Sequence, residues 1–136
     1  MAKSVLVDAG FLVALLNSRD SQHQWSIAQA AQHAPPWRTC EAVLSEAFYL
    51  LGARGAHGLS ELLRRGALMN AFHLDNDTAS VLKFLERHTD VPMSLADACL
   101  VRMTETLPDL AILTTDSDFR IYRRHSRQVV PCRLPA

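Results

Sequence analysis

The sequence has few of the residues that build disulfide frameworks and zinc sites. It contains three cysteines in 136 residues, Cys40, Cys99 and Cys132, and no two of them form a C-x-x-C pair. An odd number of cysteines without that spacing argues against a disulfide scaffold and against a thiolate zinc site. We therefore expect a protein of the reducing cytoplasm.

Net charge and long apolar runs are also missing. The 14 basic and 14 acidic side chains cancel, so nucleic-acid binding would have to come from local patches rather than from the overall charge. No apolar run approaches the roughly 20 residues of a membrane helix. The apolar start of the chain is interrupted by Asp8 and is not followed by a small-residue cleavage site. We expect neither a membrane span nor a secretory signal.

Several catalytic motifs are absent as well. The sequence has no H-E-x-x-H or other zinc spacing, no glycine-rich phosphate loop, no G-x-S-x-G elbow and no Cys–His nucleophile signature. The lysines are Lys3 and Lys83, and neither follows a late strand. This makes a phosphoacceptor domain of the response-regulator kind a weak candidate, although such domains also gather acids at strand ends.

What is present is an ordinary globular composition, 49% hydrophobic and 21% charged, in a length that suits one domain. Short strands are predicted at residues 5–7, 37–40, 71–74, 111–114 and 128–131. Helices are predicted at residues 11–16, 21–33, 41–51, 59–69, 78–87 and 94–107, with a glycine-punctuated joint at 52–58 and a short basic helix up to about residue 124. We expect Asp77 or Thr78 to cap the helix at 78–87. This alternation predicts an α/β fold, a right-handed, doubly wound, parallel sheet in a single domain over residues 1–136.

Acidic residues follow two of the predicted strands. Asp8 follows the run at residues 5–7, and Asp116 and Asp118 follow the run at 111–114. In such sheets ligands gather outside the carboxyl ends of the strands. Asp8 also has a purely structural interpretation as a helix N-cap, which is about as good as the functional one, and one of Asp116 and Asp118 could likewise cap the helix that follows.

Two further acids lie in predicted helices. Glu46 falls outside the polar arc of its helix at about 100° per residue, so we expect it on the apolar side, where a carboxylate must be paired, protonated or bound to a cation. Asp97 follows Ser94 at capping-box spacing, and by itself it is better explained as part of a helix start.

Together these positions predict one acidic cluster. Strand ends and the helix starts that follow them lie on the same edge of a doubly wound sheet, so the acids can meet there. Crowded carboxylates repel one another, and a hard divalent cation with oxygen ligands, Mg²⁺ or Mn²⁺, removes that conflict. Such a site can activate a water in line with a phosphodiester and neutralise charge on the leaving oxygen.

Hydroxyl residues surround the last two acids. Thr114, Thr115 and Ser117 could hold the water or a phosphate by hydroxyl contacts. They could equally be turn residues, which is the better interpretation of Thr114.

The densest basic cluster of the sequence comes next. It includes Arg120, Arg123 and Arg124, which could bind RNA phosphates beside a metal. A solvated helix end whose cations suit the helix dipole explains these arginines equally well.

The order and spacing of the acidic motifs resemble the PIN domain family, and within it the VapC-type toxins of bacterial toxin–antitoxin pairs. The resemblance covers essentially the whole chain. It rests on V-L-V-D ending at Asp8, L-S-E ending at Glu46, S-L-A-D-A around Asp97 and L-T-T-D-S-D-F around Asp116. It implies a three-layer α/β/α sandwich with a mainly parallel central sheet, and a Mg²⁺- or Mn²⁺-dependent endoribonuclease.

The resemblance also implies the roles of individual residues. By motif, Asp8, Glu46, Asp97 and Asp116 are the catalytic acids. The implied metal ligands are Asp8, Asp97 and Asp116, with Asp118 as an accessory ligand. Many relatives have a hydroxyl residue directly after the first aspartate, whereas this chain has Ala9, which puts a supporting hydrogen bond in doubt but not the ligands themselves.

The expected function is therefore that of a cytoplasmic endoribonuclease, the toxin of a type II pair, with RNA as substrate, a small antitoxin as partner and a homodimer as its form. The helix at residues 41–51 is apolar around most of its circumference, which fits cover by a second subunit or an antitoxin. The alternative is a non-catalytic PIN-like module that binds RNA or protein, and the presence of all four acids argues against it.

Overall fold

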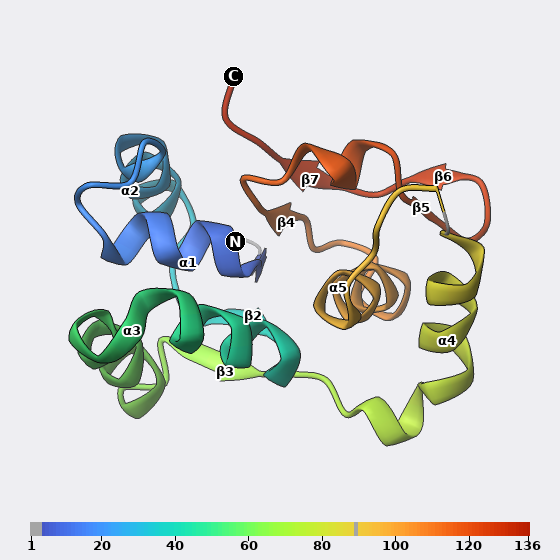
Figure 1. Ribbon diagram of the computed structural model, residues 1–136, viewed down its shortest axis with the longest axis horizontal. Helices are drawn as coiled ribbons and strands as arrows, with labels where there is room; N and C mark the ends of the chain where they lie inside the picture. Colours follow the sequence, from blue (N-terminus) through green and yellow to red (C-terminus); the bar gives the residue numbers. More distant parts are fainter. Residues whose placement is uncertain (1–3, 89) are drawn as a thin grey trace.

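A five-stranded parallel sheet forms the centre of the protein (Figure 1). The computed structural model describes residues 4–88 and 90–136. The strand order is β3-β2-β1-β4-β7, with β1 at Leu6–Val7, β2 at Trp37–Thr39, β3 at Leu68–Asn70, β4 at Ile112–Leu113 and β7 at Cys132–Arg133. All of these strand pairings are parallel. The predicted α/β/α sandwich with a mainly parallel sheet is thereby confirmed.

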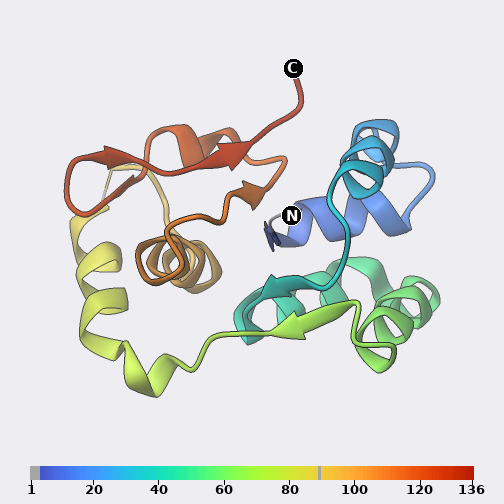
Figure 2. The same ribbon diagram turned by 180° about the vertical axis from the view of Figure 1, so that it is seen from behind.

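Helices flank this sheet. They are α1 (Ala9–Leu16), α2 (His23–Gln32), α3 (Glu41–Arg64), α4 (Thr78–Arg87) and α5 (Leu95–Thr106), with the short 3₁₀ helices η1 (Leu74–Asn76) and η2 (Ser117–Arg120). α1 packs on α2 and α3, and α4 packs on α5. Figures 1 and 2 place α2 and α4 at opposite ends of the molecule. No helix among the residues described is long and apolar enough to span a membrane.

β1 is the central strand, and its composition explains that position. Val5, Leu6 and Val7 are all buried, as a strand covered on both faces requires. Leu6 pairs with β2 on one side and with β4 on the other. The buried Thr39 hydroxyl donates to the Val7 carbonyl oxygen at 2.8 Å. The end of β1, where Asp8 stands, is therefore held from both sides.

Aromatic side chains anchor the helices on either side of that edge. Phe11 in α1 is buried and lies edge-on to Trp25 and Trp37, with ring centroids 6.3 and 5.8 Å away. Phe119 and Tyr122 are buried after β4, with ring centroids 5.4 Å apart. These contacts fix the segments on which the acidic residues stand.

The joint predicted at residues 52–58 is a single-residue kink within α3. Gly52 alone is non-helical there, with φ 68° and ψ −176°. Glycine reaches this region freely, whereas a residue with a Cβ is strained in it. The predicted helix end at residue 69 and the predicted strand at 71–74 were wrong, because Leu68–Asn70 pair with β2 as β3.

The end of the chain also differs from the prediction. The basic helix is shorter, since η2 ends at Arg120 and Arg123–Arg124 form β5, which pairs antiparallel with β6 at Gln128–Val129. The strand that joins the central sheet is instead β7, beside β4. Strands of two residues are too short to show the alternating pattern that predicts a strand from the sequence.

The start of α4 lacks the predicted side-chain cap. α4 occupies the predicted residues and Asp77 stands at its N-cap position, but the side chain of Asp77 makes no cap hydrogen bond. The Asp77 carboxylate instead accepts a hydrogen bond from Arg102 Nε at 2.7 Å, and the Thr78 hydroxyl donates to the Leu74 carbonyl oxygen. An ion pair between α4 and α5 has replaced the local cap.

Candidate active site

Asp8 lies where β1 ends and α1 begins. It is 6% exposed. Its Oδ1 accepts a hydrogen bond from the Ala9 backbone N–H at 2.7 Å, and its Oδ2 accepts one from the Thr114 hydroxyl at 2.7 Å. Burial is the largest effect on Asp8 and raises its pKa to about 7. The two hydrogen bonds lower the pKa, and the negative charges of Asp97 and Glu46 raise it further. Asp8 is thus the cap of α1 and also a carboxyl group that titrates near neutral pH.

Asp97 also combines a cap with a place in the site. Its backbone N–H donates to the Ser94 hydroxyl at 3.0 Å, and its Oδ2 accepts from the Ser94 backbone N–H at 3.1 Å. The Tyr122 hydroxyl donates to the same oxygen at 3.3 Å. Burial raises the pKa of Asp97 despite the Ser94 hydrogen bonds, and the charge of Asp116 adds to the rise.

Glu46 was predicted on the buried side of its helix, and that placement was wrong. Glu46 is exposed, as are its neighbours Tyr49 and Leu50, whereas Val43 and Ala47 face the core. The apolar residue Leu50 therefore does not mark the buried face. Partial burial still raises the pKa of Glu46, and repulsion from Asp97 and Asp116 adds to it.

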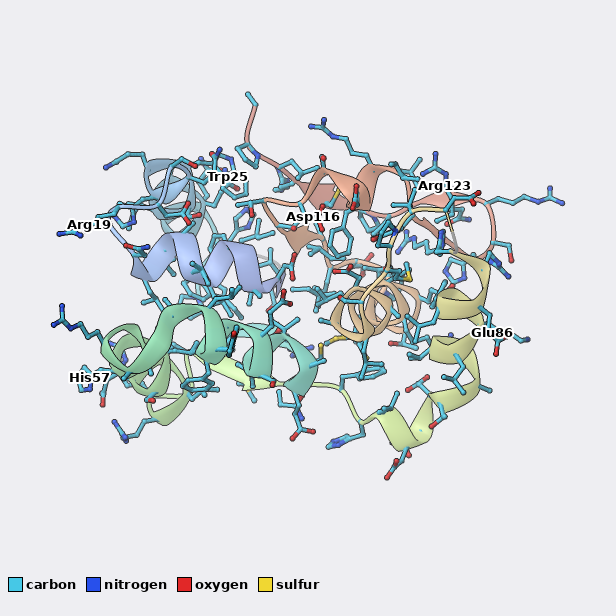
Figure 3. The ribbon with its side chains drawn as sticks, in the orientation of Figure 1. Arg19, Trp25, His57, Glu86, Asp116 and Arg123 are labelled. Carbon is cyan, nitrogen blue, oxygen red and sulfur yellow. The ribbon has the colours of Figure 1, made fainter. Side chains whose placement is uncertain are left out.

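Asp116 and Asp118 lie in the segment after β4. Asp116 Oδ1 accepts from the Asp118 backbone N–H at 2.9 Å, so Asp116 caps η2. The Asp116 backbone N–H donates to the Thr114 hydroxyl at 3.0 Å. Asp116 lies near the middle of the molecule, between α1 and η2 in the view of Figure 3.

All five acidic residues line one cleft of 390 Å³ at the carboxyl edge of the sheet. The lining residues are Asp8, Ala9, Gly10, Glu46, Leu50, Pro92, Ser94, Asp97, Thr115, Asp116 and Asp118. The acids come from the end of β1, from α3, from α5 and from the segment after β4. The fold brings together side chains that are far apart in the sequence, and their charges act on one another.

The donor set is of the kind that a hard divalent cation prefers. All five side chains offer carboxylate oxygens, which suit Mg²⁺ and Mn²⁺. Within residues 4–88 and 90–136, however, no three histidine, cysteine, aspartate or glutamate side chains are already arranged to hold a metal ion. The carboxylates of Asp8, Asp97 and Asp116 each accept a hydrogen bond from the protein. The carboxylates repel one another, and a cation bound among them would neutralise that repulsion, so the donor chemistry of the cleft fits a divalent cation.

Two residues support the site in ways that the sequence analysis missed. The Thr114 hydroxyl donates to Asp8 and accepts from the Asp116 backbone, so it links two acids rather than merely forming a turn. It also supplies a hydroxyl contact to Asp8, although Ala9 has none to offer. The Tyr122 hydroxyl donates to the Pro92 carbonyl oxygen at 2.5 Å and to Asp97. A buried threonine ending an apolar strand was a usable signal for Thr114, but no pattern pointed to Tyr122.

The predicted substrate-binding residues lie in different places. Thr115 lines the cleft, whereas the exposed Ser117 is in η2 and is not among the lining residues. Thr115 packs closely on α1, since a Cβ added at Gly10 would collide with its hydroxyl.

The predicted arginines lie outside the cleft lining. Arg123 Nη1 donates to the carbonyl oxygen of Arg120 at 2.7 Å, and Arg124 Nη1 donates to that of Thr104, near the end of α5, at 2.6 Å. Figure 3 shows Arg123 well to one side of Asp116. Arg120 is exposed in η2. RNA binding by the three arginines stays a prediction.

The protein has a parallel central sheet and an acidic cleft at the carboxyl edge of that sheet. These two features place it among the α/β/α proteins in which carboxylates gather at the strand ends. Within this class the chain belongs to the PIN domain family, whose family model matches residues 5–124. The predicted family membership is therefore confirmed.

One solved structure shares this fold over most of its length. It is the crystal structure of Mycobacterium tuberculosis VapC20, described as a Sarcin-Ricin loop cleaving toxin. The TM-score is 0.76 at 24% sequence identity, and the match covers 85% of this chain and 92% of that chain. The likeness establishes a shared fold. No curated protein matches the sequence.

Proposed function

We propose that the protein is a metal-dependent endoribonuclease that acts in the cytoplasm as the toxin of a type II toxin–antitoxin pair. The observation that carries this proposal is the convergence of Asp8, Glu46, Asp97 and Asp116 on one cleft. Membership of the PIN domain family and the fold shared with a Sarcin-Ricin loop cleaving toxin support it. The substrate is RNA, and cleavage of a phosphodiester bond is the reaction.

Each acidic residue has a role that follows from its surroundings. Asp8, Asp97 and Asp116 would hold Mg²⁺ or Mn²⁺, with Asp118 as an accessory ligand. When bound, the cation activates water and neutralises charge on the phosphate oxygens. Glu46 is exposed and its pKa is raised, so its carboxylate can accept a proton from a water in the cleft.

The neighbouring hydroxyl groups position the acids. Thr114 holds the Asp8 carboxylate and the backbone of Asp116 in a fixed relation, since its hydroxyl bonds to both. Ser94 and Tyr122 orient Asp97 Oδ2. Thr115 lines the cleft and would contact the phosphate of the substrate.

We propose protein partners as well, a small antitoxin and a second copy of the chain. On α3, Tyr49 is 85% exposed and Leu50 is 55% exposed. Large apolar side chains with that exposure favour a protein contact on this face. Leu50 also lines the acidic cleft, so a protein that covers it would reach the active site.

The proposal predicts that Asp8→Asn and Asp116→Asn abolish RNA cleavage. Asparagine caps a helix about as well as aspartate, so both variants should keep the fold while losing a charged oxygen of the site. We expect a rate loss of at least about 100-fold, because metal-assisted chemistry supplies several kcal/mol. The measurement is cleavage of a panel of tRNA and rRNA fragments, including a sarcin–ricin loop fragment, with and without Mg²⁺.

The matched control is Asp75→Asn, an exposed acid in η1, which should cut RNA at the wild-type rate. Circular dichroism and thermal unfolding check that all three variants are folded. If Asp8→Asn and Asp116→Asn cut RNA as fast as the wild type, the two acids are helix caps and the proposal fails. Wild-type protein that binds RNA but never cuts it in Mg²⁺ or Mn²⁺ would instead support the binding module.

A further inference from the structure

Two buried cysteines lie side by side outside the acidic cleft. Cys40 is the residue that precedes α3, and Cys99 lies in the second turn of α5. They are 1% and 2% exposed, and their thiols share a hydrogen bond. The contact joins residues 59 positions apart in the sequence, so the tertiary fold alone creates this pair.

The two thiols stand in the wall of a pocket of 300 Å³ between α3 and α5. The other lining residues are Glu41, Ala42, Phe72, Leu74 and Leu95. Leu74 and Leu95 are 38% and 44% exposed, so they form a partly open apolar rim. A small neutral molecule can enter such a pocket, whereas a charged one would lose its hydration there.

We propose that Cys40 and Cys99 form an oxidation site, at which a small hydroperoxide converts the two adjacent thiols into a disulfide. Two thiols that share a hydrogen bond already have their sulfur atoms facing each other, and a disulfide requires these atoms to approach to about 2.05 Å. In a reducing compartment such a bond is transient and serves as a sensor rather than as a permanent brace.

The chemistry balances in two steps. One thiol, as its thiolate, attacks a peroxide oxygen, which breaks the O–O bond, forms a sulfenic acid and releases water when hydrogen peroxide is the oxidant. The second thiol attacks that sulfur, which forms the S–S bond and releases a second water. Two electrons pass from the two sulfurs to the peroxide, and dithiothreitol reverses the change by thiol–disulfide exchange.

The two cysteines lie close in the sequence to two acids of the cleft. Cys40 precedes Glu46 by six residues, and Cys99 follows Asp97 by two. α3 and α5 pack against each other (Figure 1), so the bond would tie together the two helices that carry these acids. The oxidation itself does not depend on nuclease activity, and its test needs no RNA.

The test is oxidation of the folded full-length protein with hydrogen peroxide, followed by alkylation, digestion without reductant and mass spectrometry. We expect a peptide pair linked through Cys40 and Cys99, while Cys132 is recovered alkylated. The linked protein should unfold about 5–10 °C higher than the reduced protein, since a crosslink over this long loop restricts the unfolded chain. Dithiothreitol should reverse both changes.

Matched variants define the site. Cys132→Ser should form the link as the wild type does, and Cys99→Ala should not form it. The proposal is overturned if Cys40 and Cys99 stay reduced at peroxide concentrations that oxidise Cys132. It is also overturned if the link appears only in urea, or if the linked protein unfolds at a lower temperature than the reduced one.

Discussion

Asp8 shows how one residue can serve both the fold and a site. Its carboxylate caps α1 through the Ala9 backbone and receives the Thr114 hydroxyl, and both bonds favour the charged form. Burial acts in the opposite direction and is the larger effect, so the pKa rises to about 7. At neutral pH a fraction of the folded molecules therefore carries a proton on Asp8, and a cation would have to displace that proton.

This balance gives a prediction for stability against pH. The pKa of Asp8 is about 7 in the folded protein and 3.8 as its ordinary value. Between these values the folded state binds a proton that the unfolded state has released, so stability from this group is fully present below pH 3.8 and is lost as pH rises through about 7. Asp8→Asn removes the loss. We expect it to stabilise the protein more at pH 8 than at pH 5, by up to about 3 kcal/mol, since about two pH units of the shift lie between pH 5 and the folded-state pKa.

The measurement is urea denaturation of the wild type and Asp8→Asn at both pH values, with a chelator present so that metal binding does not contribute. Asp109→Asn, an exposed acid, serves as the control and should change stability little at either pH. An equal effect of Asp8→Asn at pH 5 and pH 8 would mean that Asp8 stays ionised throughout this range.

At the scale of elements, α3 is two helical segments joined at Gly52. A Cβ added at Gly52 would meet nothing within 4 Å, so backbone conformation alone selects glycine there. The kink separates the segment that carries Glu46 from the segment that leads into β3. It thereby lets one face of α3 line the cleft while its second half packs Leu59 and Leu62 in the core.

Gly52→Ala is expected to destabilise the protein by about 1–3 kcal/mol, because alanine is strained at this φ and ψ. Chemical denaturation measures the change. Gly66→Ala is the matched comparison, since Gly66 has φ +72° and equally open space around it, and it should lose a similar amount. Arg54→Ala, at an exposed helical position nearby, should stay within about 0.5 kcal/mol. A stable Gly52→Ala protein would mean that α3 can straighten at no cost.

The elements also differ in how well the sequence predicted them. The α4 boundaries and the Ser94–Asp97 capping box were predicted correctly, because periodicity and capping chemistry are local. β3 and β7 were not, because strands of two or three residues are defined by their partners. Glu46 was assigned to the correct helix but to the wrong face of it. The neighbouring Leu50 suggested an apolar, buried face, although Leu50 is exposed.

At the scale of the whole molecule, the acidic cleft is assembled from four separate segments, and a cation would connect them. Ligand binding to the folded state alone stabilises it, by about 2.7 kcal/mol at a free concentration 100 times the dissociation constant. We expect Mn²⁺ or Mg²⁺ to raise the unfolding temperature of the wild type, and a chelator to reverse the rise. The effect should weaken below pH 7, where Asp8 holds its proton.

Asp116→Asn should lose most of that metal-dependent shift, whereas Asp75→Asn should keep it. Thermal unfolding with increasing Mn²⁺ provides the measurement and requires no substrate. Equal shifts in the wild type and in Asp116→Asn would place the metal elsewhere on the protein.

The sequence by itself determined the class of fold, the family and the set of acidic positions. Buried strands, helix periodicity and short motifs depend on residues that are close together in the sequence, so they can be recognised without a structure. Only the tertiary structure decided which side chains meet. It linked Asp8 to Thr114 across 106 positions, brought Tyr122 to Asp97, occupied Arg123 and Arg124 with backbone carbonyls and placed Cys40 against Cys99. Such contacts depend on how short strands pair and how helices pack, and no local pattern encodes them.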